Sequence, residues 1–370
     1  MIVHIFLVPH SVYTYRFIKM VKDDLDISEH EFLFLGKDDY PGSLGTRWAK
    51  DKEFKSIRER IQFIDSTKKI GGLIKKLRSA TKIILHGTVY LFPIIFPASA
   101  LLFWPYYIKF LKKCNWVIWG IDLYFYKFKA PGLAMELKDK IRKMIIRRIP
   151  EISCQVIGDY EIAKKVYGTK AKRFYVFYPN PVENVQLDNA QARPRLWNGP
   201  VIQVGNSGDR LNNHMDALDS LAHLKGRDIK VICPLSYGGD KKYVDKVVAK
   251  GKAIFGDDFI PLLEFMSPSE YAGVLRSVEV SIMNHKNQQG LGNILALLYL
   301  GKKVYIRGDT TSFKYFKGIG IDVFDTLKFK NETFEGLFRM DEGQRRKNIE
   351  LIRKEFSDEH CVKLWKKIMK

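Results

Sequence analysis

The chain has 370 residues, about twice the usual size of one domain, so its length favours two domains. Hydrophobic residues make up 46% and charged residues 28%, an ordinary globular mixture, whereas 62 Lys and Arg against 41 Asp and Glu give a net charge of +21. The four cysteines lie far apart without any CxxC or Cys/His cluster, which excludes a cysteine-based metal site and is typical of reduced, buried thiols in the cytosol.

Short apolar runs alternate with helical patterns through the first half of the chain. Residues 2–8 predict a first strand and not a signal peptide, because a basic leader and a small-residue cleavage site are both missing. A helix is expected over 13–25, and further strands are expected at 31–36, 82–86, 115–119, 153–157 and 174–178. This alternation predicts a parallel sheet with helices on both faces.

A change of character after Tyr178 predicts a domain boundary. Residues 179–200 hold four prolines without strong periodicity, which predicts an interdomain linker over 180–199 between domains at 1–179 and 200–340. A charged helix at 341–370, with a break near Ser357, is expected to pack back toward the first domain. In the second half, strands are expected at 200–204, 228–233, 260–263, 278–283 and 303–306, and helices at 215–224, 241–250, 269–277 and 293–299.

Ligands in such sheets bind beyond the carboxyl ends of the strands, so the chemistry is sought in the loops that follow them. The loop Gly205-Asn206-Ser207-Gly208-Asp209-Arg210 follows the first strand of the second half and leads into a helix. Its glycines would let the backbone approach an anion, and Arg210 could grip phosphate oxygens in two places. An ordinary strand-to-helix turn is the alternative.

A second glycine loop, Gln288-Gln289-Gly290-Leu291-Gly292-Asn293, precedes an almost wholly apolar helix at 294–300. Because such a helix must be buried, its N-terminal turn would point out of the core and offer a site for a diphosphate. The alternative is that the two glycines only let the helix pack against a strand.

Two side chains in the first half are candidate general bases. Asp122 lies in Trp119-Gly120-Ile121-Asp122-Leu123-Tyr124, where neighbouring aromatic rings could stack on a sugar and an apolar setting would raise the pKa of the carboxyl group. A helix-capping aspartate is the alternative. His86, at another strand end, is the second candidate, although a lone histidine is more often a core or loop residue.

An apolar segment at 87–108 contains 22 residues without a charge. Three prolines interrupt it and two expected strands flank it, so it is not expected to span a bilayer. Basic clusters at 68–82 and 138–148 lie nearby, a combination that suits an anionic membrane surface. A core helix with solvated basic faces is the alternative.

These motifs resemble the enterobacterial common antigen N-acetylfucosaminyltransferases, glycosyltransferase family 56. The shared residues are GNSGDR followed by Asn212 or Asn213 and His214, WG-x-DLY at 119–124, His86-Gly87 and QQG-x-G at 288–292, in the same order. The resemblance implies a GT-B fold, an α/β architecture of two Rossmann-like domains facing a cleft. It also implies transfer of an acetamido-dideoxy sugar from a dTDP or UDP donor to an undecaprenyl-diphosphate-linked oligosaccharide, by a peripheral protein at the cytoplasmic face of the inner membrane.

The resemblance carries over residue by residue. It implies donor contacts in the second half and, on the acceptor side, Trp119, Gly120 and Tyr124, with His86, Gly87, Asp122 and Leu123 beside them. Two departures exist: Gln289 and Leu297 replace the glutamates of the wider GT-B pattern, and segment 87–108 looks longer than in the enterobacterial enzyme. The chain is therefore expected to be either that enzyme or a cousin with another donor sugar or acceptor, as in an O-antigen or capsule pathway. The donor positions are Gly205, Asn206, Ser207, Gly208, Asp209, Arg210, Gln288, Gln289, Gly290, Gly292 and Asn293.

The mechanism expected from these residues is a transfer without metal or cofactor. Backbone amides of the two glycine loops and Arg210 would stabilise the diphosphate leaving group, while Asp122 or His86 would deprotonate the acceptor if the reaction inverts configuration. One alternative is a non-catalytic nucleotide- or carbohydrate-binding module. A nucleic-acid-binding protein, suggested by the charge of +21, is disfavoured because the basic residues cluster beside an apolar segment.

Overall fold

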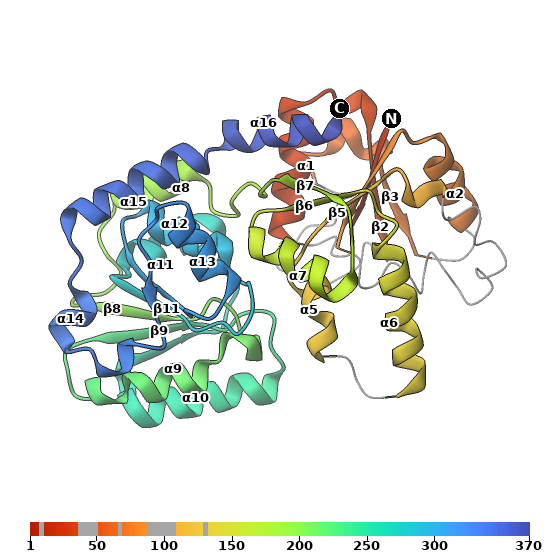
Figure 1. Ribbon diagram of the computed structural model, residues 1–370. Coiled ribbons are helices and arrows are strands. Elements are labelled where there is room, and N and C mark those ends of the chain that lie inside the picture. The colour runs from red at the N-terminus through yellow and green to blue at the C-terminus, as the bar shows by residue number, and fades with distance from the viewer. Residues whose placement is uncertain (7–10, 36–50, 66–68, 88–108, 129–131) are drawn as a thin grey trace. The chain divides into compact units, whose positions relative to one another are not determined.

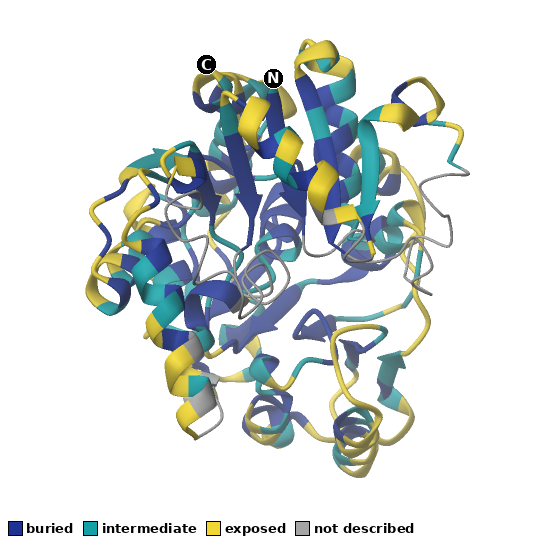
Figure 2. Cartoon of the chain, turned by 90° about the vertical axis from the view of Figure 1, so that its right-hand side faces the viewer, coloured by how far each residue is buried: buried dark blue, intermediate teal, exposed yellow. Residues whose placement is uncertain are grey.

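The computed structural model describes residues 1–6, 11–35, 51–65, 69–87, 109–128 and 132–370. These residues form two compact units, one of Met1–Pro179 with Cys361–Lys370 and one of Asn180–His360. Each unit has its own parallel sheet, and Figure 1 shows helices around both. Figure 2 shows the central strands buried and the outer faces of many helices exposed. The predicted architecture of two Rossmann-like domains is confirmed.

The sheet of the first unit has seven strands in the order β3-β2-β1-β4-β5-β6-β7. The chain builds outward from β1 on one side and from β4 on the other, so the strand order reverses between these two neighbours. Open α/β sheets bind ligands beyond the carboxyl ends of the strands at such a switch point. The strands are β1 (Ile2–Phe6), β2 (His30–Leu35), β3 (Ile61–Ile64), β4 (Lys82–His86), β5 (Cys114–Val117), β6 (Glu151–Cys154) and β7 (Lys172–Tyr175).

Six described α-helices belong wholly or mainly to the first unit. The last of them, α16, comes from the far end of the chain, and its Trp365 is fully buried with the indole N–H donating to the Phe177 carbonyl at 2.8 Å. The predicted return of the C-terminal helix to the first domain is thereby confirmed. These helices are α1 (Val12–Asp24), α2 (Ile70–Ser79), α5 (Ile121–Phe128), α6 (Leu133–Ile146), α7 (Ile157–Tyr167) and α16 (Asp358–Met369).

The second unit repeats the design with six strands in the order β10-β9-β8-β11-β12-β13. Its switch point lies between β8 and β11, which are the strands that precede the two glycine loops. The strands are β8 (Val201–Val204), β9 (Lys230–Pro234), β10 (Phe259–Leu262), β11 (Val280–Met283), β12 (Lys303–Ile306) and β13 (Phe324–Asp325).

Helices cover both faces of this second sheet, with α9 and α10 on one side and α11, α12 and α13 on the other in Figure 1. A capping box begins α11, since the side chains of Ser267 and Glu270 bond reciprocally to backbone amides there. The helices are α8 (Asn184–Gln191), α9 (His214–Leu221), α10 (Lys241–Phe255), α11 (Pro268–Ser277), α12 (Leu291–Tyr299), α13 (Thr311–Gly318), α14 (Phe334–Phe338) and α15 (Glu342–Glu355).

The segment predicted as a linker, 180–199, is instead part of the second unit. Within 180–199 the chain forms α8, which opens with a capping box between Glu183 and Gln186 and buries Leu187 and Ala190. The helix packs against α11 and belongs to the second unit. The break near Ser357 is confirmed, because α15 ends at Glu355 and α16 begins at Asp358. The apolar segment, apart from Gly87, lies outside the described residues.

Candidate active site

The two glycine loops touch one another at the switch point of the second sheet. Gly290 is in the left-handed region with φ of +69°, and a Cβ there would lie 2.8 Å from Asn206 Oδ1 and 2.8 Å from His285 Cε1. His285 Nε2 is 2.9 Å from Asn212 Oδ1, a second link between the loops. The structure therefore brings together the predicted donor residues after β8 with those after β11.

Asn212 organises the interior of the first loop. Its Oδ1 accepts a hydrogen bond from the Asn206 amide at 2.8 Å, and its Nδ2 donates to Ser207 Oγ at 3.1 Å. Gly205, with φ of +69°, has no room for a side chain, because a Cβ would lie 2.7 Å from Asn212 Oδ1. Asn206 and Ser207 are buried. Many polar groups of GNSGDR thus build the loop itself, and this corrects the expectation that all of these residues face a phosphate.

Gly208 lies where the backbones of two loops come into close contact. Its amide donates to the Tyr237 carbonyl at 2.7 Å, and a Cβ on Gly239 would lie 2.2 Å from the Gly208 carbonyl oxygen. The loop after β8 therefore packs directly on the loop after β9. Asp209 accepts a hydrogen bond from the Leu211 amide at 2.8 Å and so begins the short turn of helix Arg210–Asn212.

The guanidinium of Arg210 is engaged by a carboxylate. Its Nε and Nη2 donate to Asp240 Oδ2 at 3.0 and 2.9 Å, and its Cζ lies 5.2 Å from the Tyr243 ring centroid. The hydrogen bond from Arg210 lowers the pKa of Asp240, which also caps the start of α10. The expectation of an open fork is corrected: Arg210 is exposed, but a ligand phosphate would compete with Asp240 for it.

The start of α12 presents the remaining donor candidates. Gln288, Gln289 and Gly290 are partly exposed, whereas the body of the helix is buried. The first amides of a helix have no partner within it, so they offer donors at this rim. Asn206 Oδ1 and Gln289 Oε1 are two of several buried side-chain atoms that have no hydrogen-bond partner within the described residues.

Two candidates at this helix are held by neighbouring elements. The Tyr271 hydroxyl of α11 donates to Asn293 Oδ1, and the Asn180 side chain donates to the Gly292 carbonyl at 3.2 Å. These contacts orient the first turn of α12, and the partly exposed Gln288 and Gln289 lie just before it.

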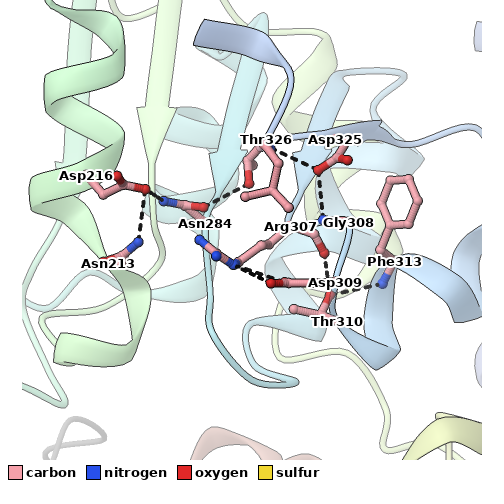
Figure 3. Close-up of polar contacts among 11 residues, drawn as sticks. Asn213, Asp216, Asn284, Arg307, Gly308, Asp309, Thr310, Phe313, Asp325 and Thr326 are labelled. Carbon is pink, nitrogen blue, oxygen red and sulfur yellow. Dashed lines mark hydrogen bonds and ion pairs between the residues drawn. The ribbon is translucent and has the colours of Figure 1, made fainter.

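A polar network ties together the next strand ends along this edge (Figure 3). Thr326 after β13 donates to Asn284 Oδ1 at 2.8 Å, and Asn284 after β11 donates to Asp216 of α9 at 2.8 Å. The Gly308 amide after β12 donates to Asp325 at 2.8 Å. The sequence analysis missed these residues, although Asn284, a polar residue directly after an apolar strand, carried the signal.

Asp122 in the first unit is sealed in the interior. Its carboxylate accepts hydrogen bonds from Trp116 Nε1 at 2.6 Å and from the Trp119 amide at 2.9 Å, and burial raises its pKa to about 7. The side chain is 0% exposed. This geometry matches the helix-capping alternative. The prediction that Asp122 is a base in contact with the acceptor hydroxyl is therefore corrected.

His86 is also fully buried, but it is not alone. Its Nε2 lies 3.1 Å from His4 Nδ1, and its Nδ1 is hydrogen bonded to the Tyr178 hydroxyl. Trp119, which is partly exposed, donates from Nε1 to the same Tyr178 oxygen at 2.7 Å. Tyr178 and His4 were missed, because only the fold brings them beside His86.

The other predicted acceptor-side residues divide into exposed and buried. Gly120 is partly exposed, whereas Leu123 and Tyr124 are buried. The Tyr124 hydroxyl donates to Asp159 at 3.0 Å, so the prediction that this ring faces an acceptor is corrected. Gly87 has φ of +88°, and its amide donates to the Val117 carbonyl at 3.1 Å, which turns the chain at the end of β4.

Comparison with known proteins identifies the family. Residues 72–323, more than half of the chain, match the family model described as "4-alpha-L-fucosyltransferase glycosyl transferase group 56". The chain belongs to glycosyltransferase family 56. The resemblance seen in the sequence motifs is confirmed, and this family 56 protein is a glycosyltransferase.

Solved structures agree on the fold at low sequence identity. A glycosyltransferase from Rickettsia africae ESF-5 is 11% identical with a TM-score of 0.64, covering 99% of this chain and 97% of that one. WaaG, a glycosyltransferase of lipopolysaccharide biosynthesis, is 10% identical with a TM-score of 0.60, covering 100% and 98%. Anabaena Alr3699/HepE, in complex with UDP and glucose, is 8% identical with a TM-score of 0.64, covering 100% and 98%. The family 56 chain thus has the GT-B fold.

Two searches of the described ranges concern metals and membranes. No three or more His, Cys, Asp or Glu side chains there are grouped so as to hold a metal ion. No helix within those ranges combines the length and apolarity needed to cross a bilayer.

Proposed function

We propose that this family 56 glycosyltransferase moves an acetamido-dideoxy sugar from a dTDP or UDP donor to a polyprenyl-diphosphate-linked oligosaccharide. The observation that carries the proposal is the contact between the two glycine loops at the β8/β11 switch point, beside the start of α12. The N-terminal amides of a buried helix attract a diphosphate, because they combine hydrogen-bond donors with the positive end of the helix dipole. The UDP complex of the HepE structure supports a nucleotide at such a fold.

The free amide oxygens support a sugar ligand. Asn206 Oδ1 and Gln289 Oε1 are acceptors without a partner among the described residues, and a buried acceptor gains when a hydroxyl or N–H group donates to it. A sugar with hydroxyl and acetamido groups supplies such donors. The fucosyl transfer in the family description is consistent with a 6-deoxy sugar.

In the proposed reaction the amides at the start of α12 stabilise the charge that grows on the leaving diphosphate. The transfer is proposed to need neither a metal ion nor a cofactor besides the nucleotide sugar. Turnover that survives dialysis against EDTA supports this, and turnover that returns only with an added divalent cation contradicts it.

A membrane surface is the proposed location of the lipid-linked acceptor. Leu133 and Leu137, one turn apart on α6, are 86% and 59% exposed, and Lys127 and Lys140 nearby in the chain are exposed as well. Apolar side chains beside lysines suit an anionic leaflet such as the cytoplasmic face of the inner membrane. Changing both leucines to Gln is expected to weaken binding to anionic vesicles at least tenfold, with Leu196→Gln, 55% exposed in the second unit, as the control.

The donor proposal is tested by thermal shift with a panel of dTDP and UDP sugars, followed by turnover with a polyprenyl-diphosphate disaccharide. A donor at 100 times its Kd stabilises the protein by about 2.7 kcal/mol. Gln289→Leu should weaken binding of the sugar nucleotide more than that of the free nucleotide, whereas Gln191→Leu on α8 should change neither. Binding without turnover would indicate a non-catalytic module, and tight DNA binding at moderate salt would favour the nucleic-acid alternative.

A further inference from the structure

Cationic side chains gather at the amino edge of the second sheet, the edge opposite the glycine loops. The neighbouring strands β8, β11 and β12 are each preceded in the chain by one of them, Arg195, Arg276 and Lys302 respectively. Because these strands are parallel, their amino ends lie at the same edge. Arg345 near the start of α15, a helix that packs against α12, is the fourth.

Hydrogen bonds and packing hold these four side chains close to one another. Lys302 Nζ donates to the Arg276 carbonyl at 2.8 Å, and Arg195 Nη2 donates to the carbonyl of the residue after Arg276 at 2.9 Å. The stem of Arg345 crosses over Gly301, where a Cβ would lie 3.2 Å from Arg345 Cγ. The amino-edge cluster is Arg195, Arg276, Lys302 and Arg345.

Acidic side chains pair with two of the four cations. Glu279 Oε1 lies 2.6 Å from Arg195 Nη2, and its Oε2 accepts a hydrogen bond from the first amide of β8 at 2.7 Å, so both oxygens of this carboxylate are engaged. Glu342 Oε1 lies 3.1 Å from Arg345 Nε. Four positive charges therefore stand against two negative charges.

The other two cations have no acidic partner in the part of the chain that the structure describes. Arg276 is partly exposed, and its buried Nε forms no hydrogen bond. Lys302 is 9% exposed, and its ammonium group, which has three donor hydrogens, bonds there only to the Arg276 carbonyl. Buried charges are normally paired, because an uncompensated charge away from water costs free energy.

Helix ends offset part of the excess charge. The carboxyl ends of α11 and α12 lead directly into β11 and β12, so both lie at this edge. Each carries roughly −0.5 charge, and together they offset about one of the two unpaired positive charges. Burial lowers the pKa of Lys302 to about 8; Glu279 opposes this shift, whereas the three arginines of the cluster reinforce it. A positive charge of about one remains without a partner.

We propose that the amino-edge cluster binds a phosphate group. An anion between Arg276 and Lys302 supplies the acceptors that their N–H groups lack, and a tetrahedral phosphate has enough oxygens to accept from a guanidinium and an ammonium group together. This chemistry fits a free phosphate ion and the head group of an anionic lipid. The donor loops lie at the carboxyl edge of the same sheet, so the inference does not depend on the proposed sugar transfer.

The test measures binding of inorganic phosphate to the full chain by calorimetric titration, at constant ionic strength with chloride as the reference anion. Lys302→Met removes the ammonium group but keeps an aliphatic stem, and Arg276→Gln removes the guanidinium group. Each is expected to weaken phosphate binding about tenfold or more, because a charge-assisted hydrogen bond is lost. Lys252→Gln removes one charge from a side chain of α10 that is 45% exposed, and should bind phosphate as the unaltered chain does.

Vesicles of phosphatidylcholine with phosphatidic acid separate the two sources of phosphate. If Lys302→Met binds these vesicles more weakly than Lys252→Gln, and no chain binds free phosphate, the ligand is a lipid head group. If the unaltered chain binds free phosphate and the two variants bind vesicles alike, the ligand is a soluble ion. Phosphate and vesicle binding that are the same in Lys302→Met and Lys252→Gln would overturn the site.

A second measurement uses the unaltered chain and needs no variant to fold. NMR of the chain with isotopically labelled lysine follows the ammonium group of Lys302 through its titration. Added phosphate should raise the pKa of this group, because a nearby anion favours the charged form. A titration that phosphate does not shift would also overturn the site. Phosphate bound at Lys302 in a chain that transfers no sugar would refute only the proposed function.

Discussion

Replacing Gly290 by alanine tests whether the two glycine loops meet as described. An alanine at φ of +69° pays the strain of the left-handed region, about 1–2 kcal/mol. Its Cβ would also approach Asn206 Oδ1 and His285 Cε1 to 2.8 Å, closer than packed atoms tolerate. Overpacking of a filled site costs a further ~1–3 kcal/mol. The free energy of unfolding of Gly290→Ala should therefore fall by about 2–5 kcal/mol.

Two other glycines separate these contributions. Gly226 has φ of +79° with nothing within 4 Å of a Cβ, so Gly226→Ala reports the backbone strain alone. Gly273 lies within α11 with nothing within 4 Å, so Gly273→Ala should stabilise the chain by roughly 0.5–1 kcal/mol. The excess cost at Gly290 over that at Gly226 measures the contact with the loop after β8.

The assay is urea unfolding followed by circular dichroism, together with calorimetric titration of the donor. Gly290→Ala should also bind the nucleotide sugar more weakly, because either loop must shift to admit the methyl group. If the two alanine variants at positive φ lose the same stability within about 0.5 kcal/mol, the loops do not touch and the donor site must be sought elsewhere.

Three further predictions concern titratable groups. Asp122→Asn should lower the free energy of unfolding by about 1–3 kcal/mol, because it creates a mismatched buried hydrogen bond. The kcat per folded molecule should stay within a few fold of the unaltered chain, and a 100-fold or greater loss of kcat would restore Asp122 as the base. Arg210→Ala should lower turnover by roughly two to three orders of magnitude if the guanidinium binds the leaving group, whereas Asp240→Ser, which keeps a capping side chain, should not; equal losses would show that the pair only secures α10. Acidification below pH 6.5 should lower the free energy of unfolding. A histidine whose pKa is depressed in the folded state stabilises the fold above the pKa that it has in the unfolded chain. That stability is lost as the pH falls, by up to ~1.4 kcal/mol per pH unit for each ring. Asp122, whose pKa is raised to about 7, has the opposite effect on stability between its ordinary pKa and pH 7, but five histidine rings outweigh one carboxyl group. An unfolding midpoint that does not move between pH 7 and 5 would contradict this prediction. The five rings are His4, His30, His86, His214 and His285.

The apolar strands could be predicted because they are buried on both faces. Strands such as β4 and β12 consist of nearly uninterrupted apolar residues that end at a polar or glycine residue, and their predicted bounds match the structure. Helix α8 was missed because it buries only Leu187 and Ala190, too few for a helical period to stand out beside four prolines. The short strands β3 and β13 were not predicted for a similar reason, because they bury too few side chains.

The candidate site could be placed from the sequence but not understood in detail. The glycine loops were recognised because glycine pairs after strands are rare enough to notice, and both do lie at the switch point. The partners of His86 could not be found, because His4 and Tyr178 reach it only through the order and register of the strands. A side chain that looks isolated in the sequence can therefore belong to a hydrogen-bonded group of side chains in the fold.

The division of labour between the loops indicates where donor specificity should be sought. Gly205 makes room for Asn212, Gly208 makes room for the loop after β9, and Ser207 bonds to Asn212, so these residues are already used inside the unit. The start of α12, with Gln288 and Gln289 partly exposed, is not used in this way. Substitutions at Gly205, Ser207 and Gly208 should then act through stability, with all donors affected alike. Substitutions at Gln288 and Gln289 should change the preference among donor sugars, because these partly exposed side chains can lose or gain a contact without unfolding the loop.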